Sequence, residues 1–366
     1  LTLAACGNDT GGTSSPDTVA YGYSGAVIKG PLQDATVFLD YDGDGVLGAN
    51  EPSVRTEADG SFALTGNVVG MGFVAQTDEN TIDTSSGEVL DNVVLKAPSG
   101  SSVVTPTTTI MEAANISAEE VVAVLGLPAG VNPLTFNPYS STVDSEVALA
   151  VEKISQQVMT TVTAVSSAIE GAGGDAAESF AMALETVVEV VKEKAAIIEE
   201  DPNASIDFSD VEEIQAVTAK IADKIEDAGI ASKEDFQAIE ADLGAAVANV
   251  NTKIDQVTDL TSDEAQAAFA VSSELNEQVK VAAEGGEEGE TAISFTEIDA
   301  LESFTEDKVT EIVAEKEEEA SGESGDPEVS DPDVDLLDPD VNPPEEEVIE
   351  EEVTEEEVIE EEVVVE

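Results

Sequence analysis

The sequence predicts an α+β protein with several domains: a small N-terminal β-sandwich, then an elongated antiparallel helical bundle, then a disordered acidic tail. Three observations predict this order. Short runs rich in Val, Phe, Ala and Thr, separated by Gly, Pro, Asp and Asn, fill residues 20–106. Apolar residues recur at helical spacing through residues 143–316. Residues 317–366 hold 24 acidic residues in 50 positions and no basic residue, so no core can form there.

The β part is predicted from its strand-like runs. These runs cover residues 25–28, 35–39, 61–64, 72–76, 89–95 and 102–104, at a spacing typical of a small sandwich. Residues 107–142 then predict two short helices, 107–115 and 117–125, and a Gly/Pro-punctuated connector. Ser117 with Glu120 three residues later forms a capping-box pattern, which indicates where the second helix begins.

The helical part is predicted from apolar stripes. From Val147 to Ile169 the apolar residues advance 22 positions in six steps, or 3.67 per step, which keeps one stripe on a nearly straight helix. Further stripes start at Phe180, Val211 and Phe236, and two less regular segments cover 269–281 and 293–312. Gly- or Pro-containing breakers at 171–174, 202, 229 and 285–289 would let each helix reverse and pack on its neighbours.

The composition excludes several classes of function. With 13 basic and 81 acidic residues the formal net charge is 13 − 81 = −68, so nucleic acid is not expected as a partner. The chain has no His and a single Cys, Cys6, which removes His-dependent triads, His-rich metal sites and CxxC redox pairs. No GxSxG motif is present, so we expect no catalytic residues and no enzyme.

One motif carries specific chemistry. The twelve residues 40–51 match the EF-hand calcium loop, which takes carboxylates from positions 1, 3 and 5, a carbonyl from position 7 and a bidentate Glu from position 12. Gly at the sixth position allows the backbone to reverse, and Gly48 at the ninth leaves room for a water. The predicted Ca²⁺ ligands are Asp40, Asp42, Asp44, Val46 and Glu51.

The residues that flank this loop predict a structural site. A strand precedes the loop at 35–39, and residues 52–56 begin no convincing helix, so the opening motion of sensor EF-hands is not expected. A seven-coordinate shell closed by Glu51 suits Ca²⁺ better than the smaller Mg²⁺. The alternative is an Asp/Gly-rich turn that stays free of metal, because turn chemistry favours the same residues.

The stretch from Ser24 through Glu51-Pro52, followed by Thr-Glu-Ala-Asp-Gly-Ser-Phe-Ala-Leu at 56–64, resembles the prealbumin-like β-sandwich modules of bacterial surface proteins. These are the SdrD-type B repeats and the carboxypeptidase-regulatory-like domains, in which a strand leads into an Asp-rich calcium loop. The resemblance implies calcium binding and a role in adhesion or structural spacing. This chain departs from the B repeats in lacking an aromatic-rich final strand and in having one module.

The N-terminus resembles a bacterial lipobox. Residues 3–6 read Leu-Ala-Ala-Cys, and in that family the Cys carries acyl chains that fix the protein to a membrane face, so Cys6 would be the lipidation site. Residues 7–19 have the composition of a flexible tether, and Gly7 follows Cys6 where an inner-membrane retention signal has Asp. The resemblance implies an exported protein anchored at the outer membrane or surface of a bacterium. The alternative is an ordinary small-residue stretch.

These observations predict a calcium-binding, membrane-anchored cell-surface lipoprotein with a structural, adhesive or partner-binding role. The alternative is a helical scaffold whose bundle exposes an apolar groove to a partner, with the β-module as a spacer. One helix would then carry two apolar faces, and the least regular helix, 261–283, is the candidate; a loosely packed edge helix is the other explanation for its pattern. The expected partners are divalent cations, the membrane through the lipid on Cys6, and a protein or cell-surface partner that the sequence does not identify.

Overall fold

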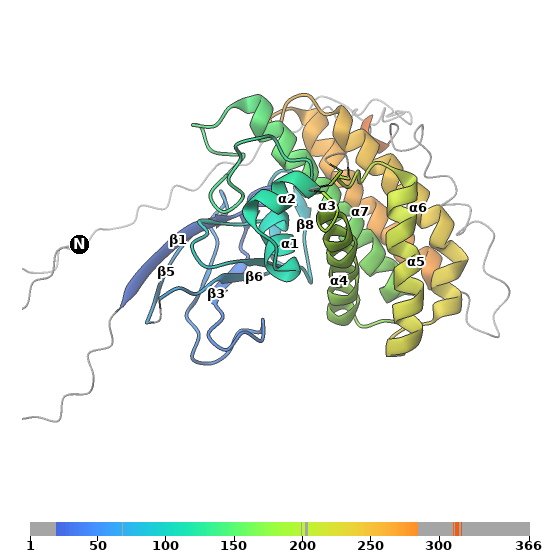
Figure 1. Cartoon of the computed structure of the whole chain (residues 1–366), viewed down its shortest axis with the longest axis horizontal. Coiled ribbons are helices and arrows are strands. Elements are labelled where there is room, and N and C mark those ends of the chain that lie inside the picture. Colours follow the sequence, from blue (N-terminus) through green and yellow to red (C-terminus); the bar gives the residue numbers. More distant parts are fainter. Residues whose placement is uncertain are drawn as a thin grey trace, which may run out of the picture. The chain divides into compact units, whose positions relative to one another are not determined.

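A computed structural model describes residues 20–67, 69–198, 200–201, 204–284, 310, 312–314 and 316. The chain divides into two compact units, Leu1–Ser324 and Gly325–Glu366, and every described residue belongs to the first. The lipobox and tether at 1–19, most of the sixth helical segment and the acidic tail at 317–366 lie outside the described residues. The described part is α+β, with a β-sheet region followed by several long helices (Figure 1).

The β region contains three small sheets within the described residues. They have the strand orders β10-β1-β5, β2-β7-β8 and β4-β3-β6-β9, and each neighbouring pair is antiparallel except β1 with β10. The strands are β1 (Tyr21–Val27), β2 (Leu32–Gln33), β3 (Thr36–Leu39), β4 (Ser53–Arg55), β5 (Ser61–Gly66), β6 (Phe73–Gln76), β7 (Ile82–Asp83), β8 (Glu88–Val89), β9 (Val94–Ala97) and β10 (Val103–Val104).

The long helices begin at side-chain caps that satisfy free backbone N–H groups of the first turn. The helices are α1 (Pro106–Ala114), α2 (Ala118–Val124), α3 (Ser145–Gly171), α4 (Ala176–Ala195), α5 (Val211–Ala228), α6 (Lys233–Gln256) and α7 (Asp263–Ala283). Their respective caps are Thr105, Ser117, Asp144, Asp175, Asp210, Ser232 and Ser262. The predicted capping box at Ser117 and Glu120 is confirmed.

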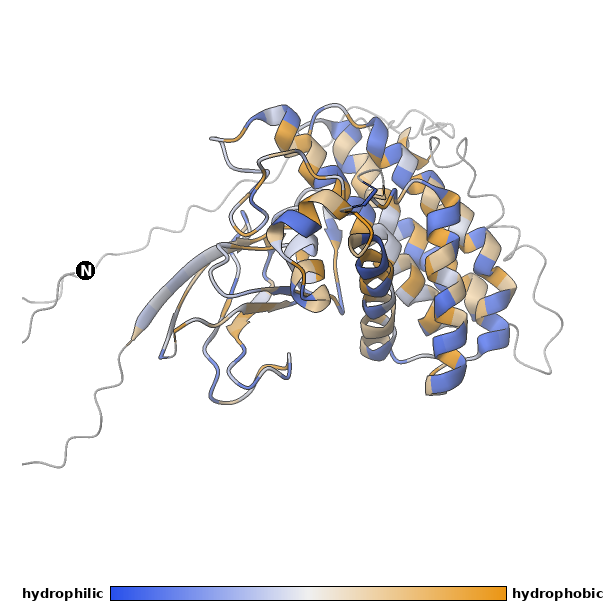
Figure 2. Ribbon diagram, in the orientation of Figure 1, coloured by the Kyte–Doolittle hydropathy of each residue, from blue (hydrophilic) through white to orange (hydrophobic). Residues whose placement is uncertain are grey.

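The predicted apolar stripes form the core. On α6 the stripe from Phe236 to Ile254 is almost fully buried, and on α3 it is buried from Val158 to Ile169. Hydrophobic and hydrophilic residues alternate along the helical ribbons (Figure 2), as expected for helices that bury one face. Val211 at the start of α5 departs from the pattern, because its side chain is 37 % exposed.

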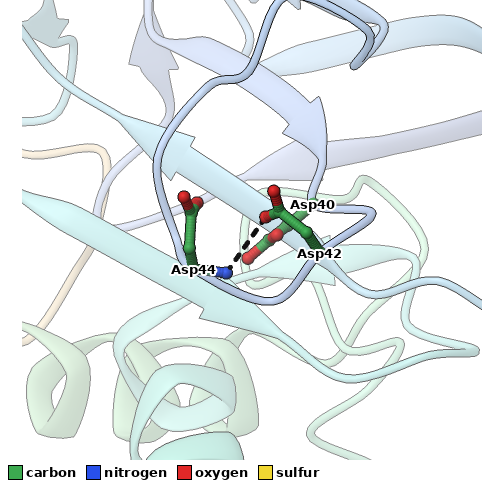
Figure 3. A group of neighbouring side chains, drawn as sticks. All are labelled: Asp40, Asp42 and Asp44. Carbon is green, nitrogen blue, oxygen red and sulfur yellow. Dashed lines mark hydrogen bonds between the residues drawn. The ribbon is translucent and has the colours of Figure 1, made fainter.

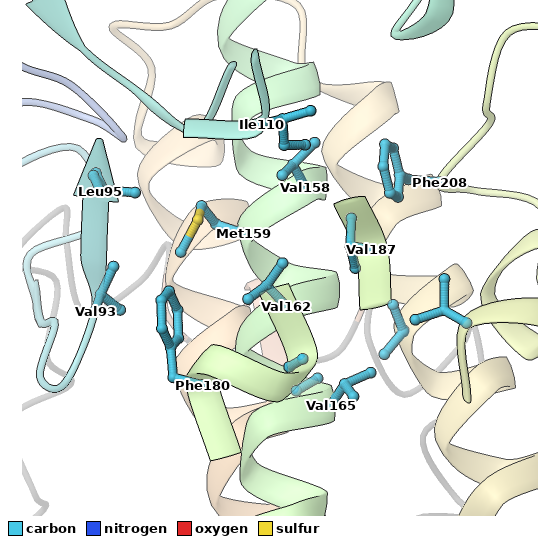
Figure 4. Packing of buried hydrophobic residues seen from close by; sticks show 14 of the residues in the cluster. Val93, Leu95, Ile110, Val158, Met159, Val162, Val165, Phe180, Val187 and Phe208 are labelled. Carbon is cyan, nitrogen blue, oxygen red and sulfur yellow. The ribbon is translucent and has the colours of Figure 1, made fainter. Parts of the chain in front are cut away.

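The β region and the helices share one hydrophobic core. Leu95 of β9, Met159 and Val162 of α3, and Phe180 of α4 belong to a single buried cluster (Figure 4). Helix α1 packs on β9 and α4, and the hydroxyl of Thr108 donates to the carbonyl of Lys96 at 2.8 Å. No helix within the described residues is long and apolar enough to cross a bilayer.

Candidate metal centre and buried charged cluster

The candidate metal centre is the loop that joins β3 to β4. Because β3 and β4 are antiparallel neighbours, with Phe38 opposite Ser53, both ends of the loop are fixed by the sheet. The carboxylates of Asp40, Asp42 and Asp44 each offer an oxygen within 4.8 Å of the others (Figure 3). The structure therefore brings together three of the predicted calcium ligands.

Backbone N–H groups hold these carboxylates in place. Asp40 accepts from Gly43 N at 2.6 Å and from Gly45 N at 2.8 Å. Asp42 accepts from Asp44 N at 3.3 Å, and Asp44 accepts from Val46 N at 2.7 Å. Gly45 has φ of +76°, a left-handed conformation that residues with a Cβ rarely adopt, which explains the Gly at the sixth position of the loop.

Glu51 closes the loop in a different way from the three aspartates. Its Oε1 accepts from Tyr41 N at 2.5 Å and its Oε2 accepts from Gly48 N at 2.7 Å, so the carboxylate ties the last position of the loop to its second and ninth. Within the described residues Glu51 is not part of the three-carboxylate group. A carboxylate oxygen has two lone pairs, so these hydrogen bonds leave sites for a cation.

Two residues distant in sequence lie against the loop, and no local sequence pattern predicted either of them. Gln76 on β6 donates from Nε2 to the carbonyl of Gly45 at 3.0 Å. Lys96 on β9 places its Nζ 2.8 Å from where a Cβ at Gly45 would lie. Strand pairing brings them to the loop, because β6 lies next to β3, and β9 lies next to β6.

The chemistry of this donor set fits a hard divalent cation. Asp42 and Asp44 are exposed, so water can complete a coordination shell. Carboxylate oxygens are ligands that Ca²⁺ and Mg²⁺ prefer, and three carboxylates this close repel one another without a counter-charge. The structure thus supplies several oxygen ligands and leaves open positions for solvent.

A second polar cluster lies buried where the β region meets α3, and sequence reasoning did not single it out. Lys29 and Asp83 form an ion pair at 2.8 Å, and both are buried. Glu152 on α3 is 0 % exposed, and its Oε1 accepts from Gly30 N at 2.8 Å and from Gln156 Nε2 at 2.8 Å. The bond from Gly30 connects two segments that are 122 residues apart in the chain.

Three atoms of this cluster have no hydrogen-bond partner within the described residues: Glu152 Oε2, Gln156 Oε1 and the hydroxyl of Tyr139. Burial raises the pKa of Glu152, and the negative charge of Asp83 raises it further, although the hydrogen bonds from Gly30 and Gln156 oppose this shift. Burial, with the charges of Glu152 and Asp83, also raises the pKa of Tyr139. The environment therefore favours the neutral forms of both groups.

Comparisons of the chain with protein-family models, with curated proteins and with solved structures found no match. The functional argument therefore depends on the geometry of this chain.

Proposed function

We propose that loop 40–51 binds one Ca²⁺ ion, and that the protein is a membrane-anchored surface lipoprotein whose β region this ion stiffens. The observation that supports the metal site best is the position of Asp40, Asp42 and Asp44, whose carboxylate oxygens lie within 4.8 Å of one another. The motif spacing supports the same site independently, because it places Val46 and Glu51 at the carbonyl and bidentate positions of an EF-hand loop.

Ca²⁺ suits this loop better than Mg²⁺. The loop offers carboxylates, a backbone carbonyl and open positions for water, which match the six to eight oxygen ligands of Ca²⁺. Mg²⁺ requires near-ideal octahedral geometry and loses its waters reluctantly. Glu51 would complete the shell by turning one or both oxygens from the N–H groups of Tyr41 and Gly48 toward the ion.

The role of the ion would be structural. The loop joins two paired strands. Two hydrogen bonds hold it further: Gln76 donates to the carbonyl of Gly45, and the hydroxyl of Tyr41 accepts from Asn67 N. No pair of helices flanks the loop, so the ion has no interhelical angle to change. Binding would instead stabilise the folded β region by mass action, by about 2.7 kcal/mol at a Ca²⁺ concentration one hundred times the Kd.

The wider proposal combines this site with the sequence. The β region would be a sandwich module, the helices an antiparallel bundle beyond it, and the acidic segment 317–366 a solvated tail. Cys6 would carry the lipid that anchors the chain at the outer membrane or cell surface. The resemblances to a lipobox and to calcium-binding surface modules support this assignment.

A calorimetric calcium titration of the full chain tests the metal site. We expect one saturable site with a Kd at or below about 10⁻³ M, and a fall in melting temperature when a chelator removes the ion. Asp42→Asn should weaken binding roughly tenfold or more, because it removes one ligand charge. Glu79→Gln is the matched control, since Glu79 is an exposed acid in another turn of the β region and should leave binding unchanged. Absence of binding at millimolar calcium would contradict the proposal and show that the loop is an Asp/Gly-rich turn that binds no metal.

A further inference from the structure

A cavity of about 290 Å³ lies away from the metal loop, between the β region and the helices. The turn after β8, the C-terminal third of α3, the start of α4 and the second half of α7 form its walls, and the buried Lys29–Asp83 pair lines it too. We call it the junction cavity. Its volume lies at the lower end of the range of ligand pockets, so it suits a small molecule.

Two polar stripes face this cavity, one on α3 and one on α7. On α3 the lining residues are Thr163, Ser166, Ser167 and Glu170. On α7 they are Ser272, Ser273, Asn276, Glu277 and Lys280. Both sets follow the spacing of one helical face. Ser166 and Ser272 are buried, and the hydroxyl of Ser272 donates to the carbonyl of Phe269 at 2.9 Å.

Unfilled hydrogen-bonding capacity points to a ligand. Asn276 Oδ1 is shielded from solvent and has no partner within the described residues. The side chain of Lys29 is 6 % exposed, and its ammonium, which has three donors, makes one hydrogen bond to the described residues, to Asp83 Oδ2 at 2.8 Å. A molecule that both donates and accepts hydrogen bonds would satisfy these groups.

The charges around the cavity select against anions. Three lysines in or beside it already have acidic partners: Lys29 with Asp83, Lys280 with Glu170 at 2.6 Å, and Lys316 with Glu88 at 3.1 Å. Asp91 and Glu277 add further negative charge to the lining. A carboxylate or phosphate would therefore be repelled, whereas neutral hydroxyl groups can donate to the acids and accept from Lys29.

We propose that the junction cavity binds a neutral polyhydroxylated molecule of about the size of a monosaccharide. Lys29 and Asn276 would hydrogen-bond its hydroxyls, and the buried ring of Phe180, which also lines the cavity, would contact an apolar C–H face. Because the ligand would contact both the β region and the helices, its binding should raise the melting temperature. This inference does not depend on the metal loop.

Titration of the full chain with neutral probes tests this inference. The probes are D-glucose, D-galactose, D-mannose and myo-inositol, with glucose 6-phosphate as the anionic counterpart, and the readouts are calorimetry and thermal melting. We expect at least one neutral probe to saturate, and to bind roughly tenfold or more tightly than glucose 6-phosphate.

Variants then locate the binding site. Asn276→Leu keeps the side-chain size and removes both polar atoms, so it should lower the affinity of that probe roughly tenfold. Gln278→Leu, on the same helix but outside the lining, is the control. Circular dichroism and urea unfolding check that the variants fold, and Ser166→Ala replaces Asn276→Leu if Asn276→Leu does not fold. Absence of saturation by every neutral probe, stronger binding of the phosphate, or unchanged binding by the cavity variant would overturn the proposal.

Discussion

Glu152 couples the β region to the helices through a single carboxyl group. One oxygen accepts from Gly30 N and from Gln156, while the other has no partner within the described residues. A Cβ at Gly30 would lie 2.0 Å from Asp83 Oδ1, so only Gly lets the backbone approach this closely. A buried acceptor without a partner costs about 1–3 kcal/mol, and burial disfavours the charged form of Glu152 and so raises its pKa.

We predict that Glu152→Gln makes the stability less dependent on pH. Burial raises the pKa of Glu152 in the folded state above its unfolded value of about 4.3. The contribution of Glu152 to stability is therefore fully present below about pH 4.3 and is lost as the pH rises through the folded pKa. A Gln amide keeps the acceptor for Gly30 and gains a donor for Tyr139. At about pH 7 the variant should be more stable than the wild type by about 1–3 kcal/mol, as measured by urea unfolding.

The comparison across pH isolates Glu152 from the other titrating groups of the cluster, Asp83, Lys29 and Tyr139, which both proteins retain. The difference in free energy of unfolding between variant and wild type should grow from about pH 4.3 to about pH 7. Glu112→Gln, which neutralises an exposed acid on α1, is the control and should show no such growth. A constant difference across this range would contradict a raised pKa for Glu152.

At the scale of secondary-structure elements, the helix caps determine where the helices begin. Asp, Ser or Thr accepts a hydrogen bond from the first turn of each of the helices α1 to α7, and acidic residues follow in the first turn of α2 through α7. These negative charges lie near the positive end of the helix dipole. Such an acidic sequence can therefore place part of its charge where it stabilises the helices.

We predict that Ser117→Ala destabilises the protein by about 1 kcal/mol. Ser117 accepts from Glu120 N at 3.2 Å, and Glu120 accepts in return from Ser117 N at 2.8 Å. The substitution removes the first bond and leaves a backbone donor of α2 without its cap. The control is Ser145→Ala at the exposed start of α3, where the cap is Asp144, and it should change the free energy of unfolding by less than about 0.5 kcal/mol. Equal effects of the two changes would contradict the capping role.

The sequence predicted the helices better than the strands because their signals differ in length. Stripes of five to seven apolar residues defined the faces of α3 to α6, whereas β2, β7 and β8 have two residues each and leave no periodic pattern. The predicted strand 89–95 was wrong in extent: β8 ends at Val89 and β9 begins at Val94, with Asn92 between them at φ of +56°. A left-handed residue interrupts extended backbone, and the chain turns there.

Among the sites too, local features were predictable from the sequence and contacts between distant segments were not. The metal loop is local, so twelve consecutive residues predicted that its three aspartates would come together. Gln76 and Lys96 reach the loop only through strand pairing, and Glu152 meets Gly30 across 122 residues. These contacts depend on tertiary packing, for which a single sequence has no periodic signal.

At the scale of the whole molecule, the large excess of acidic over basic residues is the dominant feature. Several of the 13 basic residues form ion pairs between elements, such as Lys224 of α5 with Glu185 and Glu189 of α4 at 2.9 Å. Lys220 pairs with Glu193 at 2.8 Å, and Lys280 joins α7 to Glu170 of α3 at 2.6 Å. Exposed pairs of this kind contribute at most about 1 kcal/mol each. Against 81 acidic residues they leave most of the negative charge without a basic partner.

We therefore predict that added salt stabilises the folded chain. At a net charge of −68 the acids repel one another, and screening shortens the Debye length from about 30 Å at 0.01 M to about 8 Å at 0.15 M. Screening also weakens the surface ion pairs, but these are few, so the loss of repulsion dominates and the melting temperature should rise by several degrees between these concentrations. Calorimetric scans in NaCl with a chelator present measure the effect of salt on the melting temperature without calcium binding. Scans of Asp42→Asn in calcium then separate the effect of the specific site from that of diffuse screening. A melting temperature that stays flat or falls with salt would show that pairing between helices, and not repulsion among acids, controls the stability of the molecule.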